Sequence, residues 1–136
     1  MRLSLYAAVL LACVSAAFAA PALRPPVEIP IMGLQARVND GRVILTWRRY
    51  KRDDFKSYQL VKSADAKLEY PVTPALFSAD GADATRFEDG KLSVGAWHYR
   101  LCIVTRFGDR WVSPVVTVVI GPGDLRREPP TEADFE

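Results

Sequence analysis

Residues 42–48, which read RVILTWR, decide the fold. Val43, Leu45 and Trp47 occupy alternate positions, and a period of two places them on one face of a β-strand. The same period, with many β-branched and aromatic residues, recurs in residues 55–62, 96–106 and 111–120. Shorter candidate strands lie at residues 32–38, 75–79 and 85–88. No window combines helix caps with an apolar stripe of helical period, so we expect seven short strands.

Turn-forming residues separate these segments. Asn39-Asp40-Gly41 lies between the first two strands and is typical of a tight hairpin. Phe107-Gly108-Asp109 precedes the last strand, and Asp-Gly pairs stand at residues 80–81 and 89–90. Seven strands within about 90 residues predict an all-β, immunoglobulin-like antiparallel β-sandwich.

The order of certain residues along this region matches a known pattern. In sequence order they are Leu34; Val43, Leu45 and Trp47; Tyr58 and Leu60; Phe87 and Asp89; Leu92, Gly95, Trp97, Tyr99, Leu101 and Ile103; and Ser113-Pro114 before Val116, Val118 and Ile120. With these residues the chain resembles a fibronectin type III domain from about residue 30 to residue 120. The resemblance implies a fibronectin type III-like sandwich, which serves in binding or spacing.

Two residues depart from that family's pattern. Val94 stands where the family usually has proline, and Trp97 occupies the place of the tyrosine-corner aromatic, unless Tyr99 takes that role. We do not expect an indole N–H to replace the hydrogen bond that a tyrosine hydroxyl makes to the backbone there.

The first twenty residues, MRLSLYAAVLLACVSAAFAA, are typical of a secretory signal peptide. Arg2 precedes an uncharged stretch that ends in small residues, and Ala17-Phe18-Ala19 fits cleavage after Ala19, which gives a signal peptide of residues 1–19. Two alternatives remain: an uncleaved anchor, since the stretch approaches the length of a membrane span, and lipidation at Cys13 within Leu-Leu-Ala-Cys. All three interpretations place the folded part outside the cytoplasm. We expect an exported protein that is periplasmic or extracellular, or else a membrane-anchored lipoprotein.

The length and composition of the chain allow one ordinary globular domain. The chain has 136 residues, 49% of them hydrophobic and 25% charged, and a net charge of +2, which does not predict a nucleic-acid partner. Prolines at 21, 25, 26 and 30 predict a linker over residues 20–30, before a domain of residues 31–120. Residues 121–136 hold two arginines against five acidic residues, which predicts a disordered acidic tail. Without Cys13 only one thiol remains, Cys102, which we expect to be a small buried hydrophobe.

Catalytic signatures are missing from the sequence. His98 is the only histidine, so zinc sites built on His and Cys clusters are excluded, and we expect it on a half-exposed sheet face. Asp53-Asp54 and Glu88-Asp89 are sequence neighbours whose side chains diverge in a strand or turn. No phosphate-binding loop or nucleophile elbow is present. We therefore expect no enzyme activity, cofactor or metal.

The most concentrated charge lies in Arg48-Arg49-Tyr50-Lys51-Arg52. Arg48, Arg49, Lys51 and Arg52 could bind an anionic glycan, a lipid headgroup or nucleic acid, although the same loop could simply be solvated beside Asp53-Asp54. Trp97 and Trp111 could form an exposed platform for sugars or pack in the core.

Together these observations predict a non-catalytic exported module that binds a protein or glycan at the cell envelope or outside the cell. The alternative is a passive spacer domain of a membrane-anchored lipoprotein. A nucleic-acid partner is not expected, and a membrane partner is expected only if Cys13 is lipidated or the signal peptide is uncleaved.

Overall fold

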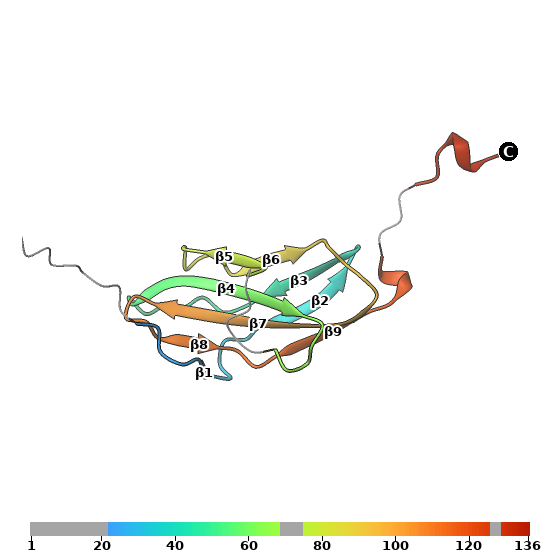
Figure 1. Cartoon of the computed structure of the whole chain (residues 1–136). Coiled ribbons are helices and arrows are strands. Elements are labelled where there is room, and N and C mark those ends of the chain that lie inside the picture. Colours follow the sequence, from blue (N-terminus) through green and yellow to red (C-terminus); the bar gives the residue numbers. More distant parts are fainter. Residues whose placement is uncertain (1–21, 69–74, 126–128) are drawn as a thin grey trace, which may run out of the picture.

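Two β-sheets pack face to face (Figure 1). The computed structural model describes residues 22–68, 75–125 and 129–136. The smaller sheet has the order β2-β3-β6, from β2 (Gln35–Asn39), β3 (Arg42–Thr46) and β6 (Arg86–Asp89). The larger sheet has the order β1-β8-β7-β4-β5, from β1 (Val27–Glu28), β8 (Arg110–Val112), β7 (Gly95–Thr105), β4 (Phe55–Ser63) and β5 (Phe77–Ala79), and β9 (Val116–Ile120) also pairs with β7. This arrangement confirms the predicted all-β sandwich.

The hairpin between β2 and β3 follows the predicted turn chemistry. Asn39 pairs with Arg42, which leaves Asp40 and Gly41 as a two-residue loop. Both loop residues have positive φ, 49° and 71°. A loop with two positive φ angles matches the right-handed twist of the strands that it joins, so these two residues set the register of the smaller sheet.

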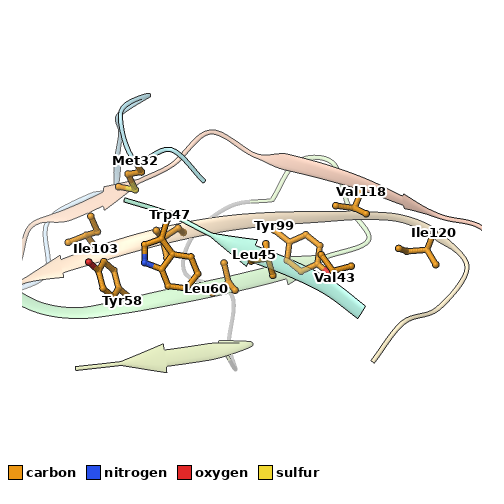
Figure 2. Packing of buried hydrophobic residues seen from close by; sticks show 11 residues of the cluster. Met32, Val43, Leu45, Trp47, Tyr58, Leu60, Tyr99, Ile103, Val118 and Ile120 are labelled. Atoms are coloured by element: carbon orange, nitrogen blue, oxygen red, sulfur yellow. The ribbon is translucent and has the colours of Figure 1, made fainter. Parts of the chain in front are cut away.

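The core lies between the sheets (Figure 2). Val43, Leu45 and Trp47 point inward from the smaller sheet, and all three are buried, as their alternation predicts. The Trp47 ring meets the Tyr58 ring of β4 edge-on, with centroids 5.7 Å apart. The inward face of the larger sheet supplies Tyr58, Leu60, Tyr99, Leu101 and Ile103.

A second, smaller cluster lies on the outer face of the larger sheet. Cys102, Val104 and Val112 form it, and Cys102 is a buried cysteine, as predicted. Nearby, Leu68 is buried and its carbonyl accepts a hydrogen bond of 3.0 Å from the Arg100 guanidinium. The start of the β4–β5 connection therefore covers part of this face.

The predicted strand over residues 111–120 is two strands in the structure. β8 ends at Val112 and β9 begins at Val116, with Ser113 and Pro114 between them. Pro114 has no backbone N–H to donate to the ladder. Ser113 holds the gap against β7, because its N–H donates to the Leu101 carbonyl and its hydroxyl accepts from the Leu101 N–H.

Residues 22–29 form an N-terminal edge segment, which corrects the prediction that residues 20–30 are only a linker. β1 lies parallel to β8, with Val27 opposite Trp111. The Arg24 N–H donates to the Gly108 carbonyl at 2.9 Å, and the Arg100 guanidinium contacts Glu28 at 2.5 Å. The segment thus covers the β8 edge, which would otherwise expose unpaired backbone groups.

The acidic tail contains two single 3₁₀ turns, η1 (Pro122–Asp124) and η2 (Glu132–Asp134). Leu125, just after η1, packs partly buried against the main core. Disorder in residues 121–136 stays a prediction. The predicted signal peptide of residues 1–19 and Cys13 lie outside the described residues, and no described helix is long and apolar enough to span a membrane.

Trp97 makes the hydrogen bond that we did not expect of an indole. Its Nε1–H donates to the Ser93 carbonyl, four residues upstream, at 2.7 Å. Because the turn before β7 brings this carbonyl to the edge of the ring, an indole N–H can replace a phenol O–H at the corner. Tyr99 has a different role, because its hydroxyl donates to Asp89.

A buried carboxylate joins the two sheets near this corner. Asp89, at the end of β6, accepts from the Lys62 ammonium at 2.6 Å and from the Tyr99 hydroxyl at 2.8 Å. Lys62 and Tyr99 belong to the larger sheet, and the Lys62 ammonium also lies 4.7 Å from the Trp97 ring centroid. Burial of the Tyr99 phenol is the larger cause, and the hydrogen-bonded Asp89 carboxylate the next, of a pKa of Tyr99 well above its usual range.

Replacing Asp89 with alanine should lower the free energy of unfolding by about 3 kcal/mol, because the Lys62 ammonium, whose side chain is only 14% exposed, would lose its counter-ion. Urea unfolding of the variant measures this loss. The neighbouring Glu88 pairs with Arg42 and Arg86 at the surface, so Glu88→Ala should cost less than about 1 kcal/mol. Equal losses in the two variants would contradict the inter-sheet role of Asp89.

Replacing Gly108 with alanine should detach the N-terminal edge segment. Gly108 has a φ of 86°, and a Cβ there would lie 2.5 Å from the Ala22 carbonyl oxygen. We expect a loss of about 1–3 kcal/mol and faster hydrogen exchange at the Arg24 amide. Gly81→Ala is the control, since a Cβ at Gly81 has no neighbour within 4 Å. Unchanged exchange at Arg24 in Gly108→Ala would contradict this account.

Candidate functional site

A groove lies at the end of the sandwich where β3 leads into β4. Its volume is about 540 Å³. One wall is the basic loop, residues 48–52, and the remaining lining residues are apolar. These are Ile29, Ile31 and Met32, from the crossing between β1 and β2, and Ile103 of β7. We call this feature the basic groove.

Backbone hydrogen bonds hold the basic loop in place. The Arg48 N–H donates to the Met32 carbonyl at 2.9 Å, which ties the loop to the opposite wall of the groove. The Tyr50 N–H donates to the Tyr58 hydroxyl at 2.9 Å. That hydroxyl in turn donates to the Ala82 carbonyl at 2.9 Å. A loop anchored at these two backbone N–H groups has less backbone entropy to lose on binding than an unanchored loop.

All four predicted binding residues line the groove, and their side chains differ in how far they are paired. Arg49 pairs with Asp83 at 2.5 Å, and Arg52 pairs with Asp54 at 3.3 Å. Arg48 reaches the Ile31 carbonyl at 3.4 Å and crosses over Gly33, where a Cβ would come within 2.9 Å of its Cγ. Lys51 is exposed, and no described residue is seen to pair with it. Arg48 and Lys51 are therefore the cations most available to an anion.

Asp53 and Asp54 do not converge, in agreement with the sequence analysis. Asp53 is exposed, whereas Asp54 is only 4% exposed. The Asp54 carboxylate accepts the Tyr50 hydroxyl at 2.7 Å. Burial, followed by this hydrogen bond and the Asp54 charge, raises the pKa of Tyr50 to about 12. Asp54 thus orients Tyr50 at the groove, and Asp53 is the less confined negative charge beside it.

The structure corrects the prediction for His98 and decides between the two alternatives for Trp97 and Trp111. His98 is 8% exposed rather than half-exposed, because the adjacent strand β9 places the Thr117 hydroxyl 2.8 Å from its Nδ1. Trp97 and Trp111 are half-buried and pack against the core, so they do not form an exposed platform.

Among residues 22–68, 75–125 and 129–136, no group of three or more His, Cys, Asp or Glu side chains is arranged to hold a metal.

The apolar side of the groove was missed in the sequence. Ile31 is 66% exposed, and it lines the groove together with Ile29 and Met32. The signal was the apolar run Ile29-Pro30-Ile31-Met32 directly after the proline-rich stretch. Its proximity to the basic loop depends on the turn between β1 and β2, which residue pattern alone does not predict.

The Tyr50 phenol should titrate near pH 12 rather than near pH 10. Folding favours its protonated form, so this contribution to stability is complete below about pH 10 and is lost as the pH rises towards 12. The difference in absorbance at 295 nm between the wild-type chain and Tyr50→Phe isolates this group during an alkaline titration. A midpoint near 10 for that difference would contradict the contact with Asp54.

Comparison with known proteins bears on the fold. No protein-family model and no curated protein sequence matches this chain. Among solved structures, pectate lyase PelI from Erwinia chrysanthemi in complex with tetragalacturonic acid is 16% identical, with a TM-score of 0.53, over 63% of this chain and 27% of that one. The FN1–FN3 domains of chicken CNTN1 are 11% identical, with a TM-score of 0.51, over 69% of this chain and 31% of that one.

One further structure matches over nearly its whole length. The sixth fibronectin type III domain of human fibronectin type III domain containing protein 3 is 15% identical, with a TM-score of 0.52, over 80% of this chain and 94% of that one. By contrast, this chain spans less than a third of the length of the pectate lyase and CNTN1 chains. At these identities the likeness establishes the fold alone. The chain has a fibronectin type III-like fold.

Proposed function

We propose that this protein is a non-catalytic exported binding module, and that its basic groove holds an acidic ligand on a protein or glycan partner. The observation that carries the proposal is the composition of the groove. Four cations and Tyr50 stand on one wall. The apolar lining consists of the exposed Ile31, the half-buried Ile29 and the buried Met32 and Ile103. Cations steer and orient an acidic ligand, and the apolar residues add the desolvated area on which affinity depends.

The volume and rigidity of the groove support this proposal. About 540 Å³ lies within the range of protein sites that hold small ligands or short segments. The loop is fixed before any ligand arrives, through the bonds from Arg48 to Met32 and from Tyr50 to Tyr58. Binding-site loops positioned by a rigid scaffold are a common use of β-sandwiches.

The surroundings of the reactive side chains support a non-catalytic role. His98 is buried against Thr117, and Cys102 is buried in the second cluster. Tyr50 and Asp54, the titratable pair nearest the groove, are hydrogen-bonded to each other. General acid–base catalysis needs a group that can exchange a proton with a ligand at working pH, and a phenol whose pKa is about 12 is poorly suited to that task.

Export is proposed from the sequence of residues 1–20. The module then acts in the periplasm or outside the cell. If Cys13 carries a lipid or the signal peptide is retained, the tether joins the domain through residue 22. Residues 22–24 lie beside Gly108, at the end of the sandwich that carries the basic loop. The groove would then face the membrane side of a tethered molecule.

Replacing Arg48, Arg49, Lys51 and Arg52 with serine should weaken retention on heparin, a polyanionic probe, about tenfold or more. Several ionic contacts, each worth some tenths of a kcal/mol, are lost together. The matched control replaces four exposed cations outside the groove, Arg37, Lys56, Lys67 and Lys91, with serine. Both variants lower the net charge equally, so a difference between them reports on the groove rather than on total charge.

Equal retention of the two variants would contradict a specific role for the groove. Equal retention of both variants and of the wild-type chain would also favour the passive spacer of a lipoprotein. Unfolding in urea confirms that each variant is folded before retention is compared.

A further inference from the structure

The C-terminal segment, residues 131–136, carries acidic and apolar groups in close sequence. It reads TEADFE, with carboxylates at Glu132, Asp134 and Glu136 around Phe135. All six residues are exposed, and Phe135 is 69% exposed. Phe135 is thus a large apolar side chain that lies at the surface with acidic residues on both sides of it in the sequence.

The segment has local order that presents these groups. The Asp134 carboxylate accepts from the Thr131 N–H at 2.8 Å and from the Thr131 hydroxyl at 3.2 Å. The Phe135 N–H donates to the Glu132 carbonyl at 3.3 Å. These bonds close η2, so part of the ordering that binding would require is already in place.

The segment and the basic groove are complementary in charge, and both carry apolar side chains beside their charges. The groove offers Arg48 and Lys51 as its most available cations, with Ile31 and Met32 as apolar lining. A phenyl ring on the apolar side would leave the flanking carboxylates facing the basic loop. Aromatic anchors surrounded by charged contacts are typical centres of protein–protein binding, and this occupant uses both walls of the groove.

The groove of the same molecule is out of reach while η2 is formed. Figure 1 shows the end of β9, after which η1 follows, at the end of the sandwich opposite to the start of β4. Leu125 lies at that end, beside the turn between β2 and β3. Nine residues lie between Leu125 and Phe135, so their Cα atoms are ten steps apart along the chain and at most about 35 Å apart when it is fully extended. The eleven residues of β7, which run along the sandwich, cover a similar length. Phe135 could therefore reach the groove of its own molecule only through a fully extended chain, and the turn at η2 shortens that chain.

We propose that the basic groove binds residues 131–136 of a second copy of this chain. This inference rests on the proposed function, since it names the acidic protein segment that the groove holds. The contact joins two different surfaces, one at each end of the molecule. Repetition of such a head-to-tail contact produces open chains rather than a closed dimer.

The first test uses a synthetic peptide of residues 129–136 with an amidated end, titrated into the full chain by calorimetry. We expect saturable binding that weakens as salt is raised. The peptide with Phe135→Ala should bind about tenfold or more weakly, because the anchor is lost. A chain with Arg48→Glu and Lys51→Glu should fail to bind the natural peptide but should bind one with Glu132→Lys and Glu136→Lys. This charge exchange shows that the altered chain is folded and that the groove is the site.

The second test measures self-association of the full chain by sedimentation. The average mass should rise with protein concentration and fall with added salt. Phe135→Ala should abolish the rise, whereas Val119→Ala, which removes another highly exposed apolar side chain, should leave it unchanged. A peptide that binds while the full chain stays monomeric at every concentration would overturn association between copies.

The two proposals can fail separately. Retention on heparin that depends on the groove, together with no binding of the peptide, would overturn the head-to-tail contact and leave the binding module intact. Loss of both would overturn both. Equal binding of the natural peptide and the Phe135→Ala peptide would also overturn the inference, because the groove would then recognise charge alone.

Discussion

The packing of the two inner sheet faces is the constraint on which the structure depends. The domain has no disulfide among its described residues, so cohesion comes from side chains such as Leu45, Trp47 and Leu60 that exclude water between the sheets. Asp89 adds a directional element, because its carboxylate bonds to Lys62 and Tyr99 across the layers. A buried carboxylate is satisfied only where its hydrogen-bond partners are in place, so Asp89 adds specificity to the apolar packing of the two sheets. The basic loop begins directly after Trp47, so the same core positions the groove.

Local pattern predicted much of this fold, and the misses have physical reasons. The strands found by alternation agree with the structure to within a few residues, since a half-buried sheet requires that alternation. β1 was missed because a strand of two residues between prolines carries no period, and its pairing with β8 joins residues far apart in the chain. The break at Ser113-Pro114 did carry a signal, because proline has no backbone N–H to donate, but the many valines around it favour one continuous strand. The bond of Trp97 depended on a turn geometry that composition does not specify.

The sequence also predicts one part of the candidate site and not the other. Its cations are contiguous in the sequence, so one short window reveals them. The partners that modulate them are distant: Asp83 lies in the connection after β5, and Ile31 in the turn after β1. His98 was expected to be half-exposed because alternation assigns a face to a side chain but does not say what covers that face. Inference from sequence is therefore strongest for groups that are local and weakest for surfaces assembled from several segments.

The burial of Cys102 makes this thiol a native reporter of fluctuation. It lies with Val104 and Val112 in the buried cluster on the outer face of the larger sheet, so a bulky alkylating reagent reaches it only when the residues that cover it move away. Under conditions where closing outpaces labelling, the alkylation rate gives the free energy of that partial opening. In an oxidising compartment the same burial would shield the Cys102 sulfur from disulfide exchange with other chains.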